Sequence, residues 1–341
     1  MMGLAGAKRN KCAPVLSPFE IEGARHDENG SGNPILIAWY DFSEPSTMFS
    51  YESLGQDIIE DGERVMVMRN KCSSSGFNHT TRGSRALGSQ LLGTTASQAP
   101  YWTAPSDGNP GYATFDGSAN ALYGMGTTGP AVTGTFSDSQ LTMNNFFMVA
   151  VCQRDDPDSP QYQDVFSIYD KTGNNLMLIT FEPTEVYAYT QVASASDKYT
   201  RYNLGTTPIP DDNKFHYHYV NGNQVYSGST AFVTVESDGF RGKWNYVYNN
   251  YNLSGSHSTT MQFDNVSANN FVGIGCSKSG INPNNARLFK GKIYEVMIFN
   301  EDLRGGALAA PPGFEPNQGR MTDKFVVEYL KRKYSYSREK L

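Results

Sequence analysis

The sequence has few features that would suit it to nucleic acid or to a membrane. Its 341 residues carry a net charge of -6 and have a pI near 5.4, so the excess of Lys and Arg that marks DNA- and RNA-binding proteins is missing. No window approaches the roughly 18 consecutive apolar residues that a spanning helix needs. The opening stretch MMGLAGAKRNK also lacks the apolar core of a secretory signal peptide. We therefore expect neither nucleic acid nor membrane as a partner.

Cysteine is scarce as well. The four residues Cys12, Cys72, Cys152 and Cys276 are far apart, which excludes a C-x-x-C motif and a small disulfide framework. Cys152 and Cys276 lie within apolar runs, so we predict that both are free thiols in the core. Two small basic clusters, 8–11 and 331–333, are interpreted as a solvated arm and as the last turn of a helix.

Residues typical of strands and turns are abundant. The chain has 33 Gly, 17 Pro, 21 Tyr and 19 Phe, and from residue 35 short apolar runs alternate with Asn-Gly, Asp-Gly and Pro. About a dozen such runs predict an all-β protein, an antiparallel β-sandwich or barrel. Examples of these runs are ILIAWYDF, NNFFMVAVCQ, NLMLITFE, KWNYVYNNYNL and KIYEVMIFN.

The organisation that we predict has two parts. Residues 1–33 are polar and rich in Gly and Asn, and are expected to form an extended N-terminal arm that is ordered by a neighbouring subunit. Residues 34–341 form the sandwich domain. This domain ends in a short amphipathic helix, 322–334, with Thr322 as its cap.

The helix has a predicted place in the fold. In the strand GKIYEVMIFN, period-two alternation puts Tyr294, Val296 and Ile298 on one face. The other face holds Ile293, Glu295, Met297 and Phe299, so both faces must be covered. The apolar stripe of the helix, which includes Tyr329, is expected to cover the second face.

Three stretches resemble concanavalin A-like (laminin-G-like) jelly-roll domains of phage, viral and bacterial surface proteins. They are GKIYEVMIFN followed by Leu303 and FVVEYLKRKYS, the run Trp39–Glu44 followed by Ser46–Phe49, and Tyr112–Gly117 followed by Leu122. The resemblance implies an antiparallel sandwich over 35–335. It does not fix activity, because this fold carries lectins, glycosidases and purely structural modules. The sequence departs from the family pattern between 200 and 265 and in the Pro-rich loop 305–319.

Catalytic patterns are absent from the sequence. It has no G-x-S-x-G, Walker or H-E-x-x-H motif. Glycosidases of this fold use E-x-D-x-x-E, and the nearest run starts at Glu236 and Asp238 but ends in Arg241. We interpret that run as a structural turn and expect no enzyme activity.

The candidate metal ligands are few. His216 and His218 are two residues apart on one strand, a spacing that could chelate a divalent metal, although solvent-facing histidines are the plainer interpretation. Asp116 could orient Ca²⁺ at the rim, but a turn-stabilising role is preferred. No cofactor is expected.

Aromatic residues beside amides are the remaining candidates for binding. They could stack on sugars or contact a protein partner, and the alternative interpretation of the second stretch is a core stripe. The candidates are Trp102, in a Pro-bounded loop, and Trp244, Tyr246, Tyr248 and Tyr251 in KWNYVYNNYNL.

Together these features predict a non-enzymatic structural protein of a virus, made in the host cytoplasm and located in the virion. We expect a capsid decoration, head-fibre or tail-associated subunit, most naturally of a bacteriophage. Its expected partners are capsid or tail proteins, further copies of itself through the N-terminal arm, and surface glycans for host attachment. The alternatives are a carbohydrate-binding adhesin module and a glycoside hydrolase of the same fold.

Overall fold

The computed structural model describes residues 36–71, 90–93, 95–106, 109–125, 141–143, 145–155, 161–173, 176–181, 186–191, 199–205, 216–223, 230–237, 244–251, 261–263, 269–277 and 287–299, together with Tyr329 and Lys333. The N-terminal arm predicted over 1–33 lies outside these residues. So does the predicted helix 322–334, apart from Tyr329 and Lys333, which are both helical.

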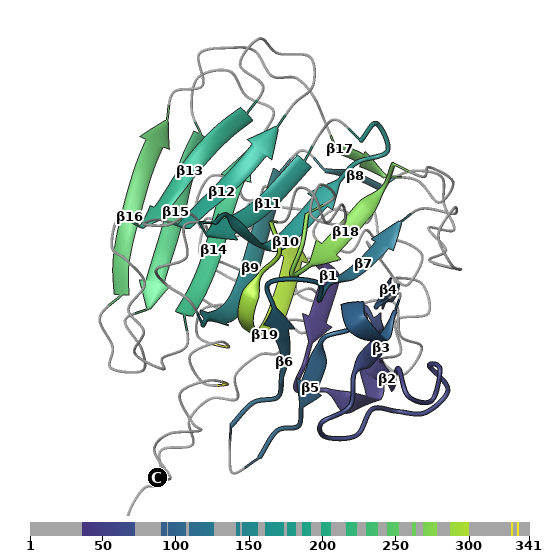
Figure 1. The fold of residues 1–341 in the computed structure, drawn as a ribbon. Coiled ribbons are helices and arrows are strands. Elements are labelled where there is room, and N and C mark those ends of the chain that lie inside the picture. The colour runs from purple at the N-terminus through teal and green to yellow at the C-terminus, as the bar shows by residue number, and fades with distance from the viewer. Residues whose placement is uncertain are drawn as a thin grey trace, which may run out of the picture.

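The first layer is a six-stranded antiparallel sheet (Figure 1). Strand β19 pairs with β9 along one edge and divides its other edge between β6 and β1, so strands from the two ends of the described chain meet in one sheet. In spatial order the strands are β14 (His216–Asn223), β9 (Asn145–Arg154), β19 (Lys290–Phe299), β6 (Tyr112–Asp116) and β5 (Tyr101–Thr103), with β1 (Leu36–Asp41) beside β19.

The second layer is a nine-stranded antiparallel sheet. Its strands, in spatial order, are β13 (Tyr199–Gly205), β12 (Val186–Gln191), β11 (Leu176–Phe181), β10 (Gln163–Tyr169), β18 (Phe271–Ile274), β7 (Leu122–Met125), β4 (Gln90–Leu92), β3 (Val65–Arg69) and β2 (Met48–Ser50).

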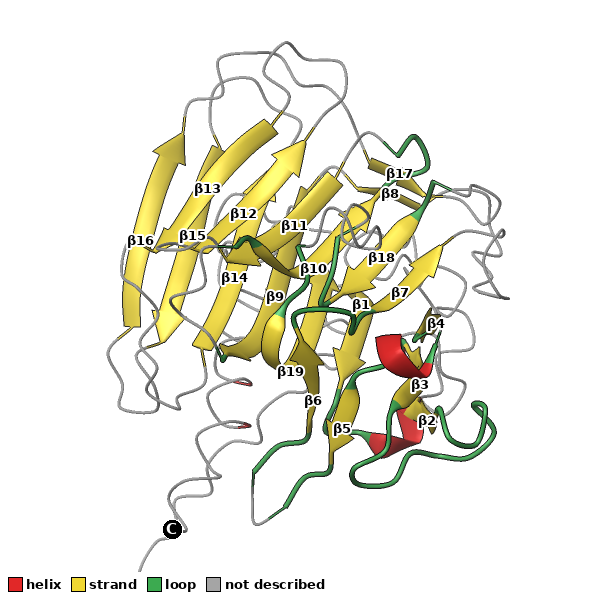
Figure 2. Ribbon diagram, in the orientation of Figure 1, coloured by secondary structure: helices red, strands yellow, loops and turns green. Residues whose placement is uncertain are grey.

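Two short ribbons and two 3-10 turns complete the described elements (Figure 2). The ribbons pair β15 (Thr230–Ser237) with β16 (Trp244–Tyr251), and β8 (Leu141–Met143) with β17 (Met261–Phe263). The 3-10 turns are η1 (Pro45–Thr47) and η5 (Ala96–Gln98). Strands β2 to β5 gather at one end of the molecule, and β15 and β16 lie at the other (Figure 1).

The main hydrophobic core lies between the two sheets. Tyr40 and Phe115 reach it from the six-stranded sheet, and Phe166 and Phe181 from the nine-stranded sheet, all with almost no exposed surface. Side chains that alternate along each strand supply this core, as face-to-face packing of two sheets requires. The predicted antiparallel β-sandwich is therefore confirmed.

Strand β19 departs from simple alternation at one point. Its pairing with β9 shifts register between Ile293 and Glu295, which is a β-bulge. The bulge brings Ile293 into the main core with Val296 and Ile298, whereas alternation alone places it on the opposite face. The predicted face of Ile293 is therefore wrong, and Glu295 keeps its place on the second face.

Candidate functional site: a buried polar network on the six-stranded sheet

Two carboxylates lie directly opposite each other on the outer face of the six-stranded sheet. Asp41 at the end of β1 and Glu295 in β19 are register partners in the antiparallel pair. The Asp41 side chain is 7% exposed and that of Glu295 is fully buried. Like charges opposite each other across two strands destabilise a sheet. This arrangement therefore needs cations close by.

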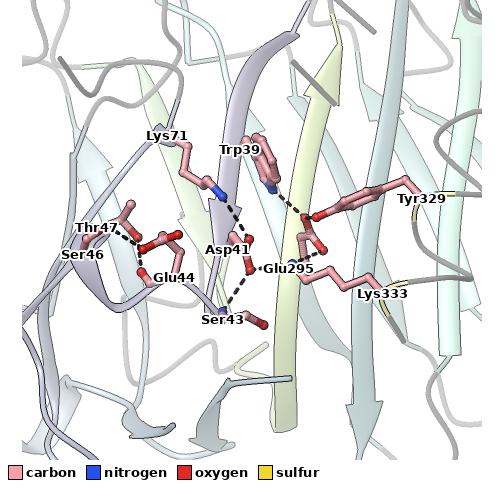
Figure 3. A network of polar contacts seen from close by, with 10 residues as sticks. All are labelled: Trp39, Asp41, Ser43, Glu44, Ser46, Thr47, Lys71, Glu295, Tyr329 and Lys333. Atoms are coloured by element: carbon pink, nitrogen blue, oxygen red, sulfur yellow. Dashed lines mark hydrogen bonds and ion pairs between the residues drawn. The ribbon is translucent and has the colours of Figure 1, made fainter. Parts of the chain in front are cut away.

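Two lysines supply the positive charge that the two carboxylates require (Figure 3). Lys333 Nζ donates to Asp41 Oδ1 at 2.7 Å and to Glu295 Oε2 at 2.9 Å, so one ammonium group bridges both carboxylates. Lys71 Nζ donates to the second oxygen of Asp41 at 3.1 Å and also lies 3.7 Å from the centre of the Trp39 ring. The buried cluster thus contains two negative and two positive groups.

Two aromatic side chains complete the hydrogen bonds of Glu295. Trp39 Nε1 donates to Glu295 Oε1 at 2.6 Å, and the Tyr329 hydroxyl donates to the same oxygen at 2.9 Å. The two rings meet edge to face at 6.1 Å between centroids. Trp39 is two residues before Asp41 on β1, so alternation places both on this face. Tyr329 and Lys333 are four residues apart and reach the network together.

A buried asparagine positions Lys71 beside this cluster. Asn70 Oδ1 accepts a hydrogen bond from the Trp39 N–H at 2.9 Å, and Asn70 Nδ2 donates to the Ile37 carbonyl at 3.0 Å. These two bonds satisfy backbone groups of β1 much as a neighbouring strand would. The residue that follows Asn70 is thereby held next to Asp41.

The charges in this network are mutually stabilised. Burial alone would raise the pKa of Asp41, but the charges of Lys333 and Lys71 outweigh it and hold the pKa below its usual value. Burial likewise opposes the charged form of Lys333, yet Glu295 and Asp41 raise its pKa. Burial and the charge of Glu295 raise the pKa of Tyr329 well above its usual value, so the hydroxyl remains a donor.

This chemistry suits attachment of a segment better than acid-base catalysis. A glycosidase needs one carboxyl group that keeps its proton near neutral pH and a second that is ionised and accessible. The pKa of Asp41 moves the other way, and Lys333 occupies the space between the two carboxylates. Of the basic run 331–333, predicted to be the last turn of a helix, the structure describes Lys333, whose side chain is 18% exposed and is paired with Asp41.

The predicted binding residue Trp102 belongs to the core instead. It is buried on β5, and its Nε1–H donates to the Phe42 carbonyl at 2.8 Å. Its neighbour Tyr101, which points the other way along the strand, is 45% exposed. The prediction that Trp102 contacts a ligand is therefore wrong, because the alternation of β5 turns the larger ring inward.

The other aromatic candidates lie together on one strand. Trp244, Tyr246, Tyr248 and Tyr251 are all in β16, which pairs with β15 in the ribbon at one end of the sandwich. The structure gives their backbone positions, and their side chains lie outside the described part. Glu236 is in β15, opposite Asn245, whereas Asp238 and Arg241 lie outside the described residues.

The candidate metal ligands do not form a described site. His216 and His218 lie on β14, paired with Cys152 and Ala150 of β9, and their side chains are outside the described part. Within the described ranges, no three His, Cys, Asp or Glu side chains gather as a metal site would require. No helix among the described residues is long and apolar enough to cross a membrane.

Asp116 stabilises a turn, as preferred in the sequence interpretation. Its Oδ1 accepts hydrogen bonds from the N–H groups of Ser118, Ala119 and Asn120 at 2.8 to 3.0 Å. Partial burial opposes ionisation, but these three donors lower the pKa of Asp116 below its usual value. The predicted core positions of Cys152 and Cys276 are also confirmed, because both are buried free thiols whose pKa is raised by burial.

A further buried acid, Asp164 on β10, was not anticipated from the sequence. It is fully buried, and among the described residues neither of its carboxylate oxygens has a hydrogen-bond partner. Burial raises its pKa, and the nearby groups of Thr180, Ser277 and Arg287 offset this only in part. A charged carboxylate at this position opposes folding.

Replacing Asp164 with Asn should therefore raise the free energy of unfolding at pH 7 by about 1–3 kcal/mol. A raised folded-state pKa means that the unfolded state releases the proton first as pH rises above the usual aspartate pKa of 3.8, so the penalty grows above that pH and vanishes below it. Urea unfolding at pH 7 and at pH 3.5 measures both values. Asp41→Asn is the matched control and should lower stability at pH 7. A loss of stability in Asp164→Asn at pH 7 would contradict this explanation.

Comparison with known proteins finds similar structures but no similar sequences. No protein-family model and no curated protein sequence matches it. The CBM40 of the Ruminococcus gnavus IT-sialidase, bound to α2,3 sialyllactose, is 7% identical with a TM-score of 0.32, covering 47% of this chain and 78% of that chain. A heptameric SAP-like pentraxin from Limulus polyphemus is 16% identical with a TM-score of 0.31, covering 56% and 76%.

A viral protein is also among the similar structures. The enzymatically active domain of bacteriophage CBA120 tailspike protein 2 is 12% identical with a TM-score of 0.34, covering 60% of this chain and 28% of that chain. Likeness at this level concerns the fold alone, and no residue's role is transferred from these proteins. What the strand order itself shows is an antiparallel β-sandwich of two sheets.

Proposed function

We propose that this protein is a non-enzymatic, carbohydrate-binding β-sandwich and that it serves as a structural subunit of a virus particle. The observation that carries the binding role is strand β16. Its sequence WNYVYNNY places three of the four aromatic candidates at alternate positions, with Asn residues between and after them, on a ribbon at the end of the sandwich (Figure 1). Rings beside amides suit the apolar faces and hydroxyl groups of sugars.

The absence of catalysis is supported by the buried network. Asp41 and Glu295 are bridged by Lys333, and the pKa of Asp41 is lowered rather than raised. A general acid must keep its proton near neutral pH, and the lowered pKa of Asp41 does not suit that role. Their hydrogen bonds hold the C-terminal residues Tyr329 and Lys333 on the sheet, which is a structural task.

The particle role rests on the chain's chemistry and on the resemblance of its sequence to viral jelly-roll domains. The buried free thiols Cys152 and Cys276 fit a protein that folds in a reducing host cytoplasm. A decoration, head-fibre or tail-associated subunit should stay with purified particles through density-gradient centrifugation. Its loss from particles under mild salt would count against this role.

Glycan binding is expected to be weak for one domain and to depend on β16. Full-length protein on a glycan array should retain a defined set of glycans, with Kd in the micromolar to millimolar range typical of recognition that relies on several copies. Trp244→Ala should weaken binding about tenfold, equivalent to about 1.4 kcal/mol, because it removes one stacking ring. Tyr162→Ala is the matched control, since it removes a ring that is 41% exposed and lies outside β15 and β16. An empty array, or equal binding by Trp244→Ala, would contradict the proposal.

A further inference from the structure

Among the described residues, three of the four large exposed apolar side chains lie at one end of the sandwich, and the fourth is Tyr162, just before β10. Leu54 and Ile58 lie in the loop between β2 and β3 and are 69% and 54% exposed. Tyr101 lies next to this loop, because it forms an antiparallel β-bridge with Arg64. The Arg64 guanidinium lies 4.4 Å from the centre of the Tyr101 ring. Together Leu54, Ile58 and Tyr101 form what we call the 54–58–101 patch. An apolar patch rimmed by polar residues is typical of an interaction site.

The loop that carries the patch is held in place by hydrogen bonds. Gly55 N–H donates to the Ser50 carbonyl at 2.8 Å, and Ile59 N–H donates to the Met48 carbonyl at 3.1 Å. Ile59 is buried, so the loop is anchored directly beside the exposed Ile58. Leu54 itself has a φ of 56°, which a branched L-residue rarely adopts. The exposure of Leu54 is thus a feature of an ordered turn.

Acidic groups surround the patch. The segment 51–64 contains five carboxylates and only one basic residue, Arg64. The side chain of that arginine is already used, because it donates to the Ala96 carbonyl and to the Tyr101 hydroxyl. The acidic residues are Glu52, Asp57, Glu60, Asp61 and Glu63, all of them exposed except Glu63, which is half-buried. The patch therefore combines apolar contact area with negative potential.

We propose that this patch binds the N-terminal segment 1–19 of a second copy of the chain. That segment has the complementary chemistry: it carries Lys8, Arg9 and Lys11, its first acidic residue is Glu20, and it begins with Met1, Met2 and Leu4. Thirty-five residues precede β1, and at about 3.3–3.6 Å each an extended chain of that length reaches more than 100 Å. This inference rests on the proposed particle role, for which it names the contact between subunits.

The contact is tested by photo-crosslinking in the full-length protein. Leu54 is replaced by p-benzoyl-phenylalanine, and unlabelled and ¹⁵N-labelled chains are mixed, irradiated, digested and analysed by mass spectrometry. We expect crosslinked peptides between position 54 and residues 1–19, with both isotopes in one product. Because Leu54 is exposed, the melting temperature should stay unchanged, which a thermal scan verifies.

Charge-reversal variants identify the electrostatic part of the contact. Asp57→Lys combined with Asp61→Lys should lower the crosslink yield at least fivefold, and raising the salt from 0.05 to 1 M should lower it as well. Asp155→Lys, at an exposed acid after β9, is the matched control and should leave the yield unchanged. No crosslink, crosslinks to any other segment, or crosslinks within one chain alone would overturn the inference. Glycan binding is measured separately, so failure of this contact leaves the array result intact, and the reverse also holds.

Discussion

Replacing Glu295 with alanine should lower the free energy of unfolding by about 3–5 kcal/mol, the cost of removing one partner from a buried ionic network. The variant leaves the Trp39 N–H and the Tyr329 hydroxyl without their acceptor and leaves Lys333 with Asp41 alone. Urea unfolding followed by Trp fluorescence measures the change. Glu44→Ala is the matched control, because the Glu44 carboxylate is less buried and accepts from Ser46 at 2.7 Å, and it should cost less than about 0.5 kcal/mol.

A double variant separates the cost of a broken pair from the value of the pair. Glu295→Met with Lys333→Met should recover much of the stability, since removing both charges together leaves Asp41 paired with Lys71. If Glu295→Ala costs less than about 1 kcal/mol, the network does not hold the C-terminal segment.

The same network sets how stability depends on pH. The lowered pKa of Asp41 adds stability above its usual value of 3.8, and this is lost as pH falls through the folded-state pKa. The raised pKa of Lys333 adds stability below 10.5, and this is lost as pH rises through its folded-state pKa. In the double variant the Lys333 contribution should disappear, and the Asp41 contribution should shrink to the part that Lys71 supplies.

Replacing Gly291 with alanine should destabilise the protein more than any other addition of a single methyl group to β19. Gly291 has a φ of 146°, and a Cβ atom there would lie 2.1 Å from the Gln153 carbonyl oxygen and 3.0 Å from the Arg154 Cα. Both are backbone atoms of β9, so the central strand pair would have to separate. We expect a loss of more than about 3 kcal/mol, seen as a fall in the urea midpoint or as insoluble protein.

A second glycine isolates the contribution of the clash. Gly62 has a φ of 85°, yet a Cβ atom there would meet nothing within 4 Å. Gly62→Ala should therefore cost only the conformational term, about 1 kcal/mol. Equal losses in the two variants would show that contact with β9 is not the cause.

Local patterns predicted the framework of this protein well. Runs such as IAWYDF and KIYEVMIF became the paired strands β1 and β19, and Asp116 took the turn that its Asp-Gly sequence indicates. These features depend on neighbours within a few residues, and alternation or turn chemistry reports them directly. The bulge that moves Ile293 to the core depends on how β19 meets β9, and alternation carries no sign of it.

The site required tertiary information. Asp41 and Glu295 are separated by most of the chain, and only strand register makes them opposite. The one local signal was a carboxylate within each otherwise apolar strand, which implies a buried partner. Trp102 shows the converse, because its Pro-bounded surroundings suggested a loop, whereas β5 buries the ring. No local sequence pattern predicted that Asp164 is buried.

Recognition of carbohydrate without cleavage is the central claim, and mass spectrometry tests it most directly. The glycan that the array identifies is incubated with the full-length protein and with the Glu295→Gln variant at pH 5 and pH 7. The masses of the bound and the free glycan are then measured. We predict that the glycan is bound and recovered intact in every sample. A shortened glycan released by the wild-type protein, and not by Glu295→Gln, would contradict the claim.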